Sequence, residues 1–136
     1  LQMTEPNYAS AASLFGNLPD LRFAICHFAS PWDQSPEGIK RWRAAMLNFA
    51  ALPGAHVKFS GFGMFKPDWS AEDLRPFVEA ALDLFGEDRC MAGSNFPVDK
   101  LYGRYDRIWA ALSEIVGTGE TYRKVTLENA RKYYRV

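Results

Sequence analysis

Short apolar segments alternate with longer amphipathic segments along the chain, and this alternation restricts the possible folds more than any other feature. Three apolar runs, at residues 21–27, 55–60 and 89–94, have the length and composition of strands. The ends of successive runs are about 33 residues apart, and a helical pattern follows each run. Strands and helices that repeat at this period predict βαβ units with parallel strands.

The helical segments carry recognisable start and stop signals. Ser35 precedes Pro36 at the start of one helix, and Ser70 with Asp73 resembles a capping box at the start of another. Glycines or Pro-Gly follow the apolar positions and end the helices. We expect helices between Ser35 and Pro53, between Ser70 and Gly86, between Tyr105 and Gly117, from about Thr121 to Tyr134, and from Asn7 to Phe15 after a strand end at Leu1–Thr4.

Two architectures fit this alternation. One is half of a (β/α)₈ barrel, since eight such units need about 250 residues. The other is a doubly wound α/β domain of flavodoxin size, and the periodicity alone does not decide between them. Gly61-Phe62-Gly63 begins like a dinucleotide-binding loop, but the third glycine and the following helix are missing. A nucleotide site is therefore disfavoured.

The composition describes one globular domain, residues 1–136. The chain is 48% hydrophobic and 15% aromatic, which is ample for a packed core. Sixteen basic and sixteen acidic residues cancel, so nothing favours nucleic acid or an anionic membrane surface as a partner. There is no apolar run of about 20 residues and no signal peptide at the start. Cys26 and Cys90 are expected to be reduced thiols, which favours a cytoplasmic protein.

The ends of the expected strands hold the candidate catalytic groups, because chemistry collects at the carboxyl ends of parallel strands. His27 closes an apolar strand, a position that suits a metal ligand or general base as well as a structural histidine. In the next strand the alternation directs Lys58 and Ser60 to one face, which in a barrel is the lumen. Lys58 would bind a substrate anion or form a structural ion pair with a strand of the other half of the barrel.

The loops after the strands supply further substrate-binding candidates. Trp32 and Trp69 place aromatic surface on two neighbouring loops, which suits a small cyclic substrate or a lid over the core. Asp99, with Lys100, follows the third strand and is a rim ligand or one half of an ion pair.

Residues 89–101, Arg-Cys-Met-Ala-Gly-Ser-Asn-Phe-Pro-Val-Asp-Lys-Leu, resemble the last-strand signature of the amidohydrolase family 2 proteins. This family includes lactonases of 2-pyrone-4,6-dicarboxylate and of sugar acids such as fuconate. The segments around His27, at 57–61 and at 129–135 resemble its sixth strand, seventh strand and terminal helix in the same order. The resemblance implies the C-terminal half, about strands 5–8 with their helices, of a (β/α)₈ TIM barrel of the metal-dependent hydrolase type.

The resemblance also implies a function for the full-length parent. It would hydrolyse a lactone, amide or related bond of a small cyclic organic acid, with a divalent metal such as zinc held mainly by residues outside these 136. His27 matches the strand-six histidine and would orient substrate or water. Asn95 stands where the family carries an aspartate, and an amide can neither act as a base nor bind zinc well. Asn95 would instead donate a hydrogen bond to the developing oxyanion, and Asp99 would replace the carboxylate only if its loop folds back.

The substitution at Asn95 and the lack of a His-x-His pair keep a second hypothesis open, a non-catalytic binding or assembly module derived from the barrel. The fragment itself is expected to be inactive and to bind no catalytic metal. Its open sheet edges predict a homo-oligomer. Cys26 and Cys90 should lie on strands separated by one other strand, too far apart for a disulfide.

Overall fold

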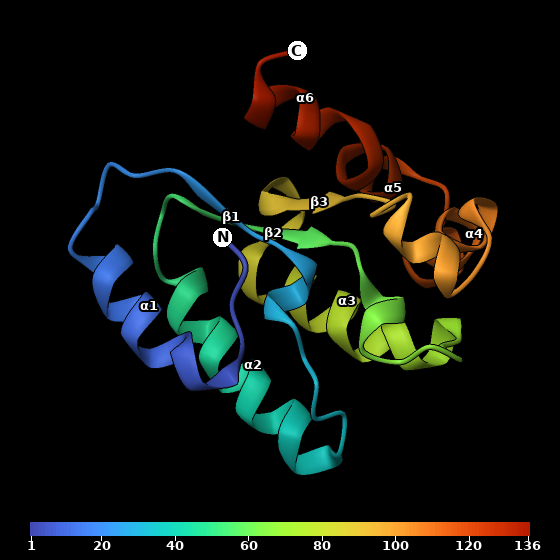
Figure 1. Ribbon diagram of the computed structural model, residues 1–136. Helices are drawn as coiled ribbons and strands as arrows, with labels where there is room; N and C mark the ends of the chain where they lie inside the picture. Colours follow the sequence, from blue (N-terminus) through green and yellow to red (C-terminus); the bar gives the residue numbers. More distant parts are fainter.

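The computed structural model describes all residues 1–136 as an α/β fold with one parallel sheet (Figure 1). The strand order is β1 (Phe23–Ile25), β2 (Ala55–Phe59) and β3 (Cys90–Ala92), so strands follow one another in space as they do in the chain. Ile25 is aligned with Val57, and Val57 is aligned with Cys90. This progression in one direction agrees with consecutive strands of a barrel wall.

The first residue of the chain extends this sheet beyond β1. The nitrogen of Leu1 donates to the carbonyl of Ala24 at 2.7 Å, and its carbonyl accepts from the nitrogen of Cys26 at 2.7 Å. Leu1 thus bonds to the residues before and after Ile25, as a residue does in a parallel ladder. The expected strand end at Leu1–Thr4 is thus present as a single paired residue.

The helices are found where the sequence signals predicted them. Ser35 accepts from the nitrogen of Gly38 at 3.1 Å, and Ser70 and Asp73 form the complete capping box. Gly86 and Gly117 each follow a helix, and both glycines have a positive φ. The helices are α1 (Tyr8–Gly16), α2 (Pro36–Ala50), α3 (Ala71–Phe85), α4 (Tyr105–Val116), α5 (Glu120–Arg123) and α6 (Asn129–Tyr134), with a π-helical turn at Lys124–Glu128 between the last two.

The strand predictions were too long at their ends. The run 21–27 forms a strand only up to Ile25, because the residues from His27 onward adopt a left-handed conformation. In the run 89–94, Arg89 belongs to a short helical turn before β3. After β3 the pairing continues for one residue, since the nitrogen of Gly93 donates to the carbonyl of Phe59 at 3.0 Å.

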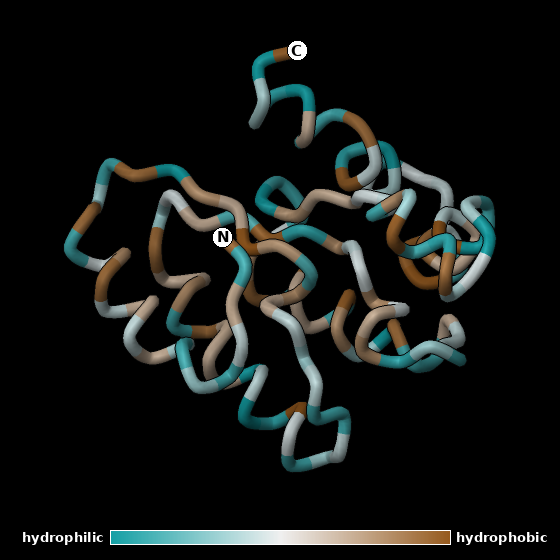
Figure 2. Tube along the Cα trace, viewed as in Figure 1, coloured by the Kyte–Doolittle hydropathy of each residue, from teal (hydrophilic) through white to brown (hydrophobic).

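The core lies between the sheet and the helices α1 to α4. In β2 the residues Val57 and Phe59 are buried on this side, while His56 and Lys58 on the opposite face are half-buried. This confirms the predicted alternation. Figure 2 shows that the apolar segments converge on the strands, whereas the hydrophilic segments lie mainly at the outer turns.

The C-terminal segment lies across the amino ends of the strands. The amide of Asn129 donates to the carbonyls of Glu87 and Cys90 at 2.6 and 2.8 Å, and Arg22 donates to the carbonyl of Tyr133 at 2.7 Å. Only loops follow at the carboxyl ends of the strands.

Since Cys26 follows β1 and Cys90 begins β3, β2 separates them as predicted, and both are free thiols.

Candidate active site

The residues that follow β1 form a left-handed turn of four non-glycine residues. His27, Phe28, Ala29 and Ser30 have φ angles of 55, 52, 62 and 60°. Residues other than glycine rarely adopt this conformation, and a run of four is disfavoured at each residue. Such backbone persists only where the surroundings enforce it, and it concentrates at functional sites.

Two buried aromatic side chains hold this turn in place. The hydroxyl of Tyr8 donates to the carbonyl of Ala29 at 2.7 Å, and the indole nitrogen of Trp42 donates to the carbonyl of Phe28 at 2.6 Å. The ring of Phe28 stacks on that of Phe59 with centroids 5.1 Å apart. These contacts fix the backbone that carries His27 at the carboxyl edge of the sheet.

The imidazole of His27 lies against the end of β2. Its Nδ1 is 2.9 Å from the hydroxyl of Ser60. Gly61, at φ 68°, has no side chain beside it, and a Cβ there would lie 2.6 Å from Nδ1. Burial lowers the pKa of His27, a hydrogen bond with the backbone of Ser60 opposes this effect, and Lys58 lowers the pKa further. The imidazole therefore favours its neutral form, which can accept a proton.

The loop after β3 folds back on itself and brings Asp99 to Asn95. The nitrogen of Asp99 donates to the carbonyl of Asn95 at 3.1 Å, which closes one turn and places the two side chains together. Asn95 has a left-handed φ of 54°, and its Nδ2 donates to Asp99 Oδ1 at 2.9 Å and contacts Met64 Sδ at 3.6 Å. Its nitrogen is thus engaged, and its carbonyl oxygen has no hydrogen-bond partner in the chain.

Gly61 and Met64 connect these two groups. A Cβ on Gly61 would meet the His27 ring at 2.6 Å and the Met64 methyl at 2.7 Å, and Met64 also contacts Asn95. His27 and Asn95, predicted from separate strands, thus surround the same segment at the carboxyl edge. That proximity is the main result of the site geometry.

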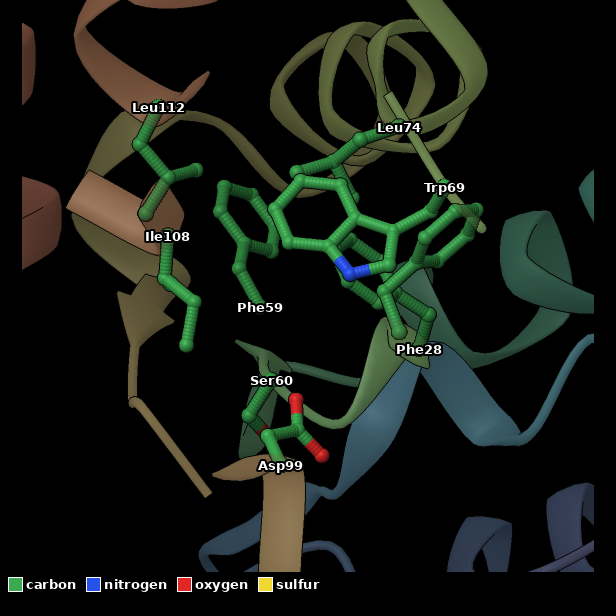
Figure 3. Close-up of a pocket in the computed structure, with 9 residues that line it drawn as sticks. Phe28, Phe59, Ser60, Trp69, Leu74, Asp99, Ile108 and Leu112 are labelled. Carbon is green, nitrogen blue, oxygen red and sulfur yellow. The ribbon is translucent and has the colours of Figure 1, made fainter. Parts of the chain in front are cut away.

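Asp99 is almost fully buried, with 5% of its surface exposed. Burial raises its pKa, and the Asn95 amide and His27 act in the opposite direction. Asp99 and Ser60 are the polar residues of a cavity that is otherwise apolar (Figure 3). The other lining residues are Phe28, Phe59, Phe62, Trp69, Leu74, Ile108 and Leu112.

The remaining predicted binding residues occupy three different environments. Trp69 is 3% exposed in the wall of this cavity, and the Arg107 guanidinium lies 4.6 Å above its ring. Trp32 is 61% exposed and meets the ring of Phe65 at 4.9 Å. Lys58 lies on the inner face of β2 with Nζ 5.9 Å from the Tyr134 ring, and it belongs to none of the ion pairs of the chain.

These residues do not by themselves make a metal centre. No group of three or more His, Cys, Asp or Glu side chains is arranged to hold a metal ion. His27 and Asp99 are the nearest candidates, but one Asp99 oxygen is taken by Asn95 and His27 Nδ1 by Ser60. These two residues therefore do not fit a metal ion without further ligands. No helix of the chain has the length and apolar character required to span a membrane.

Comparison with known proteins identifies the family. A family model described as amidohydrolase matches residues 1–136. The chain belongs to the amidohydrolase family. Among curated proteins, an uncharacterized Sinorhizobium fredii protein, y4mH, is 41% identical over 122 residues, which are 88% of this chain and 41% of that protein. An L-fucono-1,5-lactonase of Burkholderia multivorans is 40% identical over 84 residues, or 57% of this chain and 28% of that protein.

Solved amidohydrolase structures share the fold. An amidohydrolase from Burkholderia multivorans, solved with bound zinc, matches all of this chain with a TM-score of 0.89 and 23% identity, and the match covers 51% of that protein. A putative 2-pyrone-4,6-dicarboxylic acid hydrolase from Pseudomonas putida matches 94% of this chain with a TM-score of 0.75 and 20% identity, covering 49% of that protein. The chain therefore spans about half the length of these amidohydrolases and has the fold of half an amidohydrolase barrel, not of a doubly wound domain.

Sequence reasoning did not find the residues that support the candidate site. Tyr8, Trp42 and Met64 look like ordinary apolar core residues in the sequence, and only the turn that they contact gives them their role. Asp99 was a candidate from the sequence, and one signal for its contact with Asn95 was available. It lies four residues after Asn95, the spacing that brings two side chains together on a helical turn.

Proposed function

We propose that the complete protein is a hydrolase that opens a lactone, amide or related bond in a small cyclic organic acid. The observation that carries this proposal is the convergence of His27 and Asn95 at the carboxyl edge of the sheet, both in left-handed backbone. Family membership and the two L-fucono-1,5-lactonase relatives, the second of them from Burkholderia ambifaria at 33% identity over 105 residues, support lactones as the bond type.

In the proposed reaction His27 is the general base. Its Nδ1 is engaged by Ser60, which leaves Nε2 for a water molecule in the hollow of the barrel. Nε2 removes a proton from this water as the oxygen attacks the substrate carbonyl carbon. When the tetrahedral intermediate collapses, the bond from this carbon to the ring oxygen or nitrogen breaks, and the proton passes from Nε2 to that leaving atom. The neutral form that burial favours makes the imidazole ready for this step.

Asn95 positions the attacking water. Because its nitrogen is held by Asp99 and Met64, Asn95 accepts a hydrogen bond from the water through its carbonyl oxygen and does not donate one to the oxyanion. This role differs from the donor role that the sequence suggested. An amide cannot take the proton, so the proton passes to His27.

Lys58 is proposed to hold a substrate carboxylate or the developing oxyanion. It projects from the inner face of β2, two residues before Ser60, and no carboxylate of the chain pairs with it. A cation without an ionic partner on that face suits an acidic substrate. Trp32 would cover the ring of such a substrate from the exposed rim.

The test is turnover by the complete protein. We expect hydrolysis of L-fucono-1,5-lactone, related sugar lactones or 2-pyrone-4,6-dicarboxylate, followed as acid release in a pH-stat with elemental analysis for zinc in parallel. No turnover over this panel, with binding of the same compounds retained, would instead support the alternative of a non-catalytic binding module. The 136-residue fragment alone is expected to show no turnover.

Association of the fragment through its open sheet edges stays a prediction. Leu1 and β3 leave unpaired backbone at the two edges of the sheet, which favours pairing with a second copy. Sedimentation of the fragment should show a dimer or larger species, and a monomer at high concentration would contradict it.

A further inference from the structure

A polar hollow at the carboxyl end of β1 has no role in the function proposed above. It lies between the segment that precedes α1 and the loop that leads into α2, and its volume is about 200 Å³. This is the space of roughly six or seven water molecules, at about 30 Å³ each. Tyr8 and Trp42, the two buried side chains that hold the turn after β1, belong to its lining. The hollow therefore lies behind that turn, on the side of the helices.

Ser30 directs a hydroxyl without a partner into this hollow. The residue is 3% exposed, and its Oγ makes no hydrogen bond within the chain. Gln34 Nε2 is the one polar side-chain atom that is sealed from solvent without a partner, so Ser30 Oγ keeps a small accessible surface. Since Ser30 lines the hollow, we place that surface there. The bonds to the carbonyls of Phe28 and Ala29 fix this turn, which orients the hydroxyl before any ligand binds.

Two carboxylates in the lining share one arginine. Arg41 Nε donates to Glu5 Oε1 at 2.6 Å, and Arg41 Nη2 donates to Asp33 Oδ2 at 2.7 Å. Asp33 Oδ1 accepts from the nitrogen of Ser35 at 3.0 Å. Of the four carboxylate oxygens, Glu5 Oε2 is thus the one that keeps its full capacity to accept from a ligand. The three charged side chains together carry one net negative charge.

These groups favour a neutral ligand that has several hydroxyl groups. The net negative charge disfavours a carboxylate or a phosphate. Arg41 and the amino-terminal end of α2, which lines the hollow at Gly38, both disfavour a compact cation. A ligand hydroxyl can donate to Glu5 Oε2, and another can donate to or accept from Ser30. Trp32, 61% exposed, offers an aromatic ring to the C–H groups of a sugar.

We propose that this hollow binds one neutral sugar ring. Ser30 and Glu5 bond to its hydroxyl groups, and Trp32 covers its apolar face. The site is separate from the proposed reaction, because it lies behind the turn whose His27 serves the interior of the barrel. Trp32 is the one residue that the two ligands share. Binding in the hollow therefore requires no turnover.

The test is an NMR titration of the complete protein labelled with ¹⁵N-tryptophan, with Trp32→Phe to assign the Trp32 signal. The probes are the methyl glycosides of glucose, mannose, galactose and fucose, which contain no lactone to hydrolyse. We expect at least one of them to shift the Trp32 signal with a Kd in the millimolar range, as suits a ligand of this size. Methyl glucuronide and choline should bind at least about ten-fold more weakly.

Three variants locate the bound sugar. Ser30→Ala removes one hydrogen bond and should weaken binding about five-fold. Glu5→Gln removes a charged acceptor and should weaken it about ten-fold. Thr4 is an exposed residue of the lining, so Thr4→Phe should fill the hollow and abolish binding without disturbing the core.

Three control variants make the same changes at exposed positions outside the hollow. Ser10→Ala and Ser13→Phe are on α1, and Glu79→Gln is on α3, where it removes an ion pair with Arg75. All three should bind the glycoside as the wild type does. Equal weakening in Ser10→Ala and Ser30→Ala would contradict the assigned role of Ser30.

The proposal would be overturned if the folded wild type bound none of the methyl glycosides. Binding that Thr4→Phe leaves unchanged would also overturn it, because the sugar would then lie elsewhere. Tighter binding of choline than of every glycoside would show that the hollow takes an organic cation instead. Hydrolysis of lactones without glycoside binding would contradict this proposal alone, and glycoside binding without hydrolysis would leave only the proposed function contradicted.

Discussion

The two ends of the sheet are built on opposite principles. At the amino end, Arg89 donates to the carbonyls of Phe85, Ala50 and Leu52, and Asn129 closes the start of β3 with two further bonds. At the carboxyl end, five non-glycine residues have left-handed backbone, and Asp99 is buried with one oxygen unpaired inside the chain. The amino end satisfies its polar groups, whereas the carboxyl end accepts strain and desolvation.

This difference favours the carboxyl end as the position of the candidate site, independently of any relative. Conformational strain and desolvated charges lower stability, so they persist where they serve a purpose. The same kind of substitution at the two ends should therefore have different effects, on activity at the carboxyl end and on stability at the amino end.

The largest effect is expected from paired substitutions of the two histidines. His27→Gln should lower kcat/KM of the complete protein by about 10²- to 10⁴-fold, the usual contribution of a general base, with little change in Tm. His56→Gln should leave kcat/KM unchanged, because His56 lies toward the amino end, bonded to the carbonyl of Gly54 and packed on Tyr133. Equal losses in both variants would remove the functional contrast between the ends.

The next largest effect is on stability at the amino end. Arg89→Met leaves three carbonyls without their donor and should lower the free energy of unfolding by about 3 kcal/mol, measured by urea denaturation. Arg43→Met removes an exposed ion pair with Asp83 and should cost less than about 1 kcal/mol. Both variants should keep the activity per folded molecule. A large loss of this activity in Arg89→Met would contradict the assignment of function to the carboxyl end of the sheet.

Two serine-to-glycine substitutions should have smaller effects on stability, and these effects should be opposite at the two positions. Ser30→Gly relieves a left-handed residue and should stabilise the protein by about 1 kcal/mol. Ser113→Gly, inside α4, should instead destabilise it by about 0.5–1 kcal/mol. If thermal unfolding showed that Ser30→Gly destabilises the protein, the turn after β1 would not be strained.

The pH dependence of stability should also differ at Asp99. Burial raises its pKa above the ordinary value of 3.8, so the unfolded chain loses this proton at lower pH than the folded chain. Stability therefore falls as pH rises from the unfolded pKa through the folded pKa. Asp99→Asn should remove this fall and be more stable than the wild type at neutral pH, with the difference vanishing near pH 3. Urea denaturation across this range would show the opposite order if Asp99 were stabilised by an undetected cation.

The architecture could be predicted from the sequence because it depends on local signals. The caps at Ser35 and Ser70, the glycine stops and the alternation through Val57 and Lys58 each act within a few residues of their effect. The family motif at 89–101 then distinguished the barrel from the doubly wound domain, which the periodicity could not do.

The site could be predicted only in part. His27 was predicted because strand ends collect chemistry, and Asn95 was predicted from the family resemblance, but the orientation of both side chains depends on contacts distant in the sequence. The left-handed turn after β1 rests on Tyr8 and Trp42, and Trp69 proved to be a buried wall of the cavity. The role of Asp99 required the loop to fold back, which a one-dimensional pattern does not determine.

The most direct test of the central claim is a crystal structure of the complete protein with the cyclic acid or a hydrolysis product bound. The account predicts that His27 Nε2 and Asn95 Oδ1 both lie within about 3.2 Å of the oxygen atoms at the reacting carbon, inside the barrel. A ligand bound away from both side chains, or His27 turned outward beneath a helix, would contradict it.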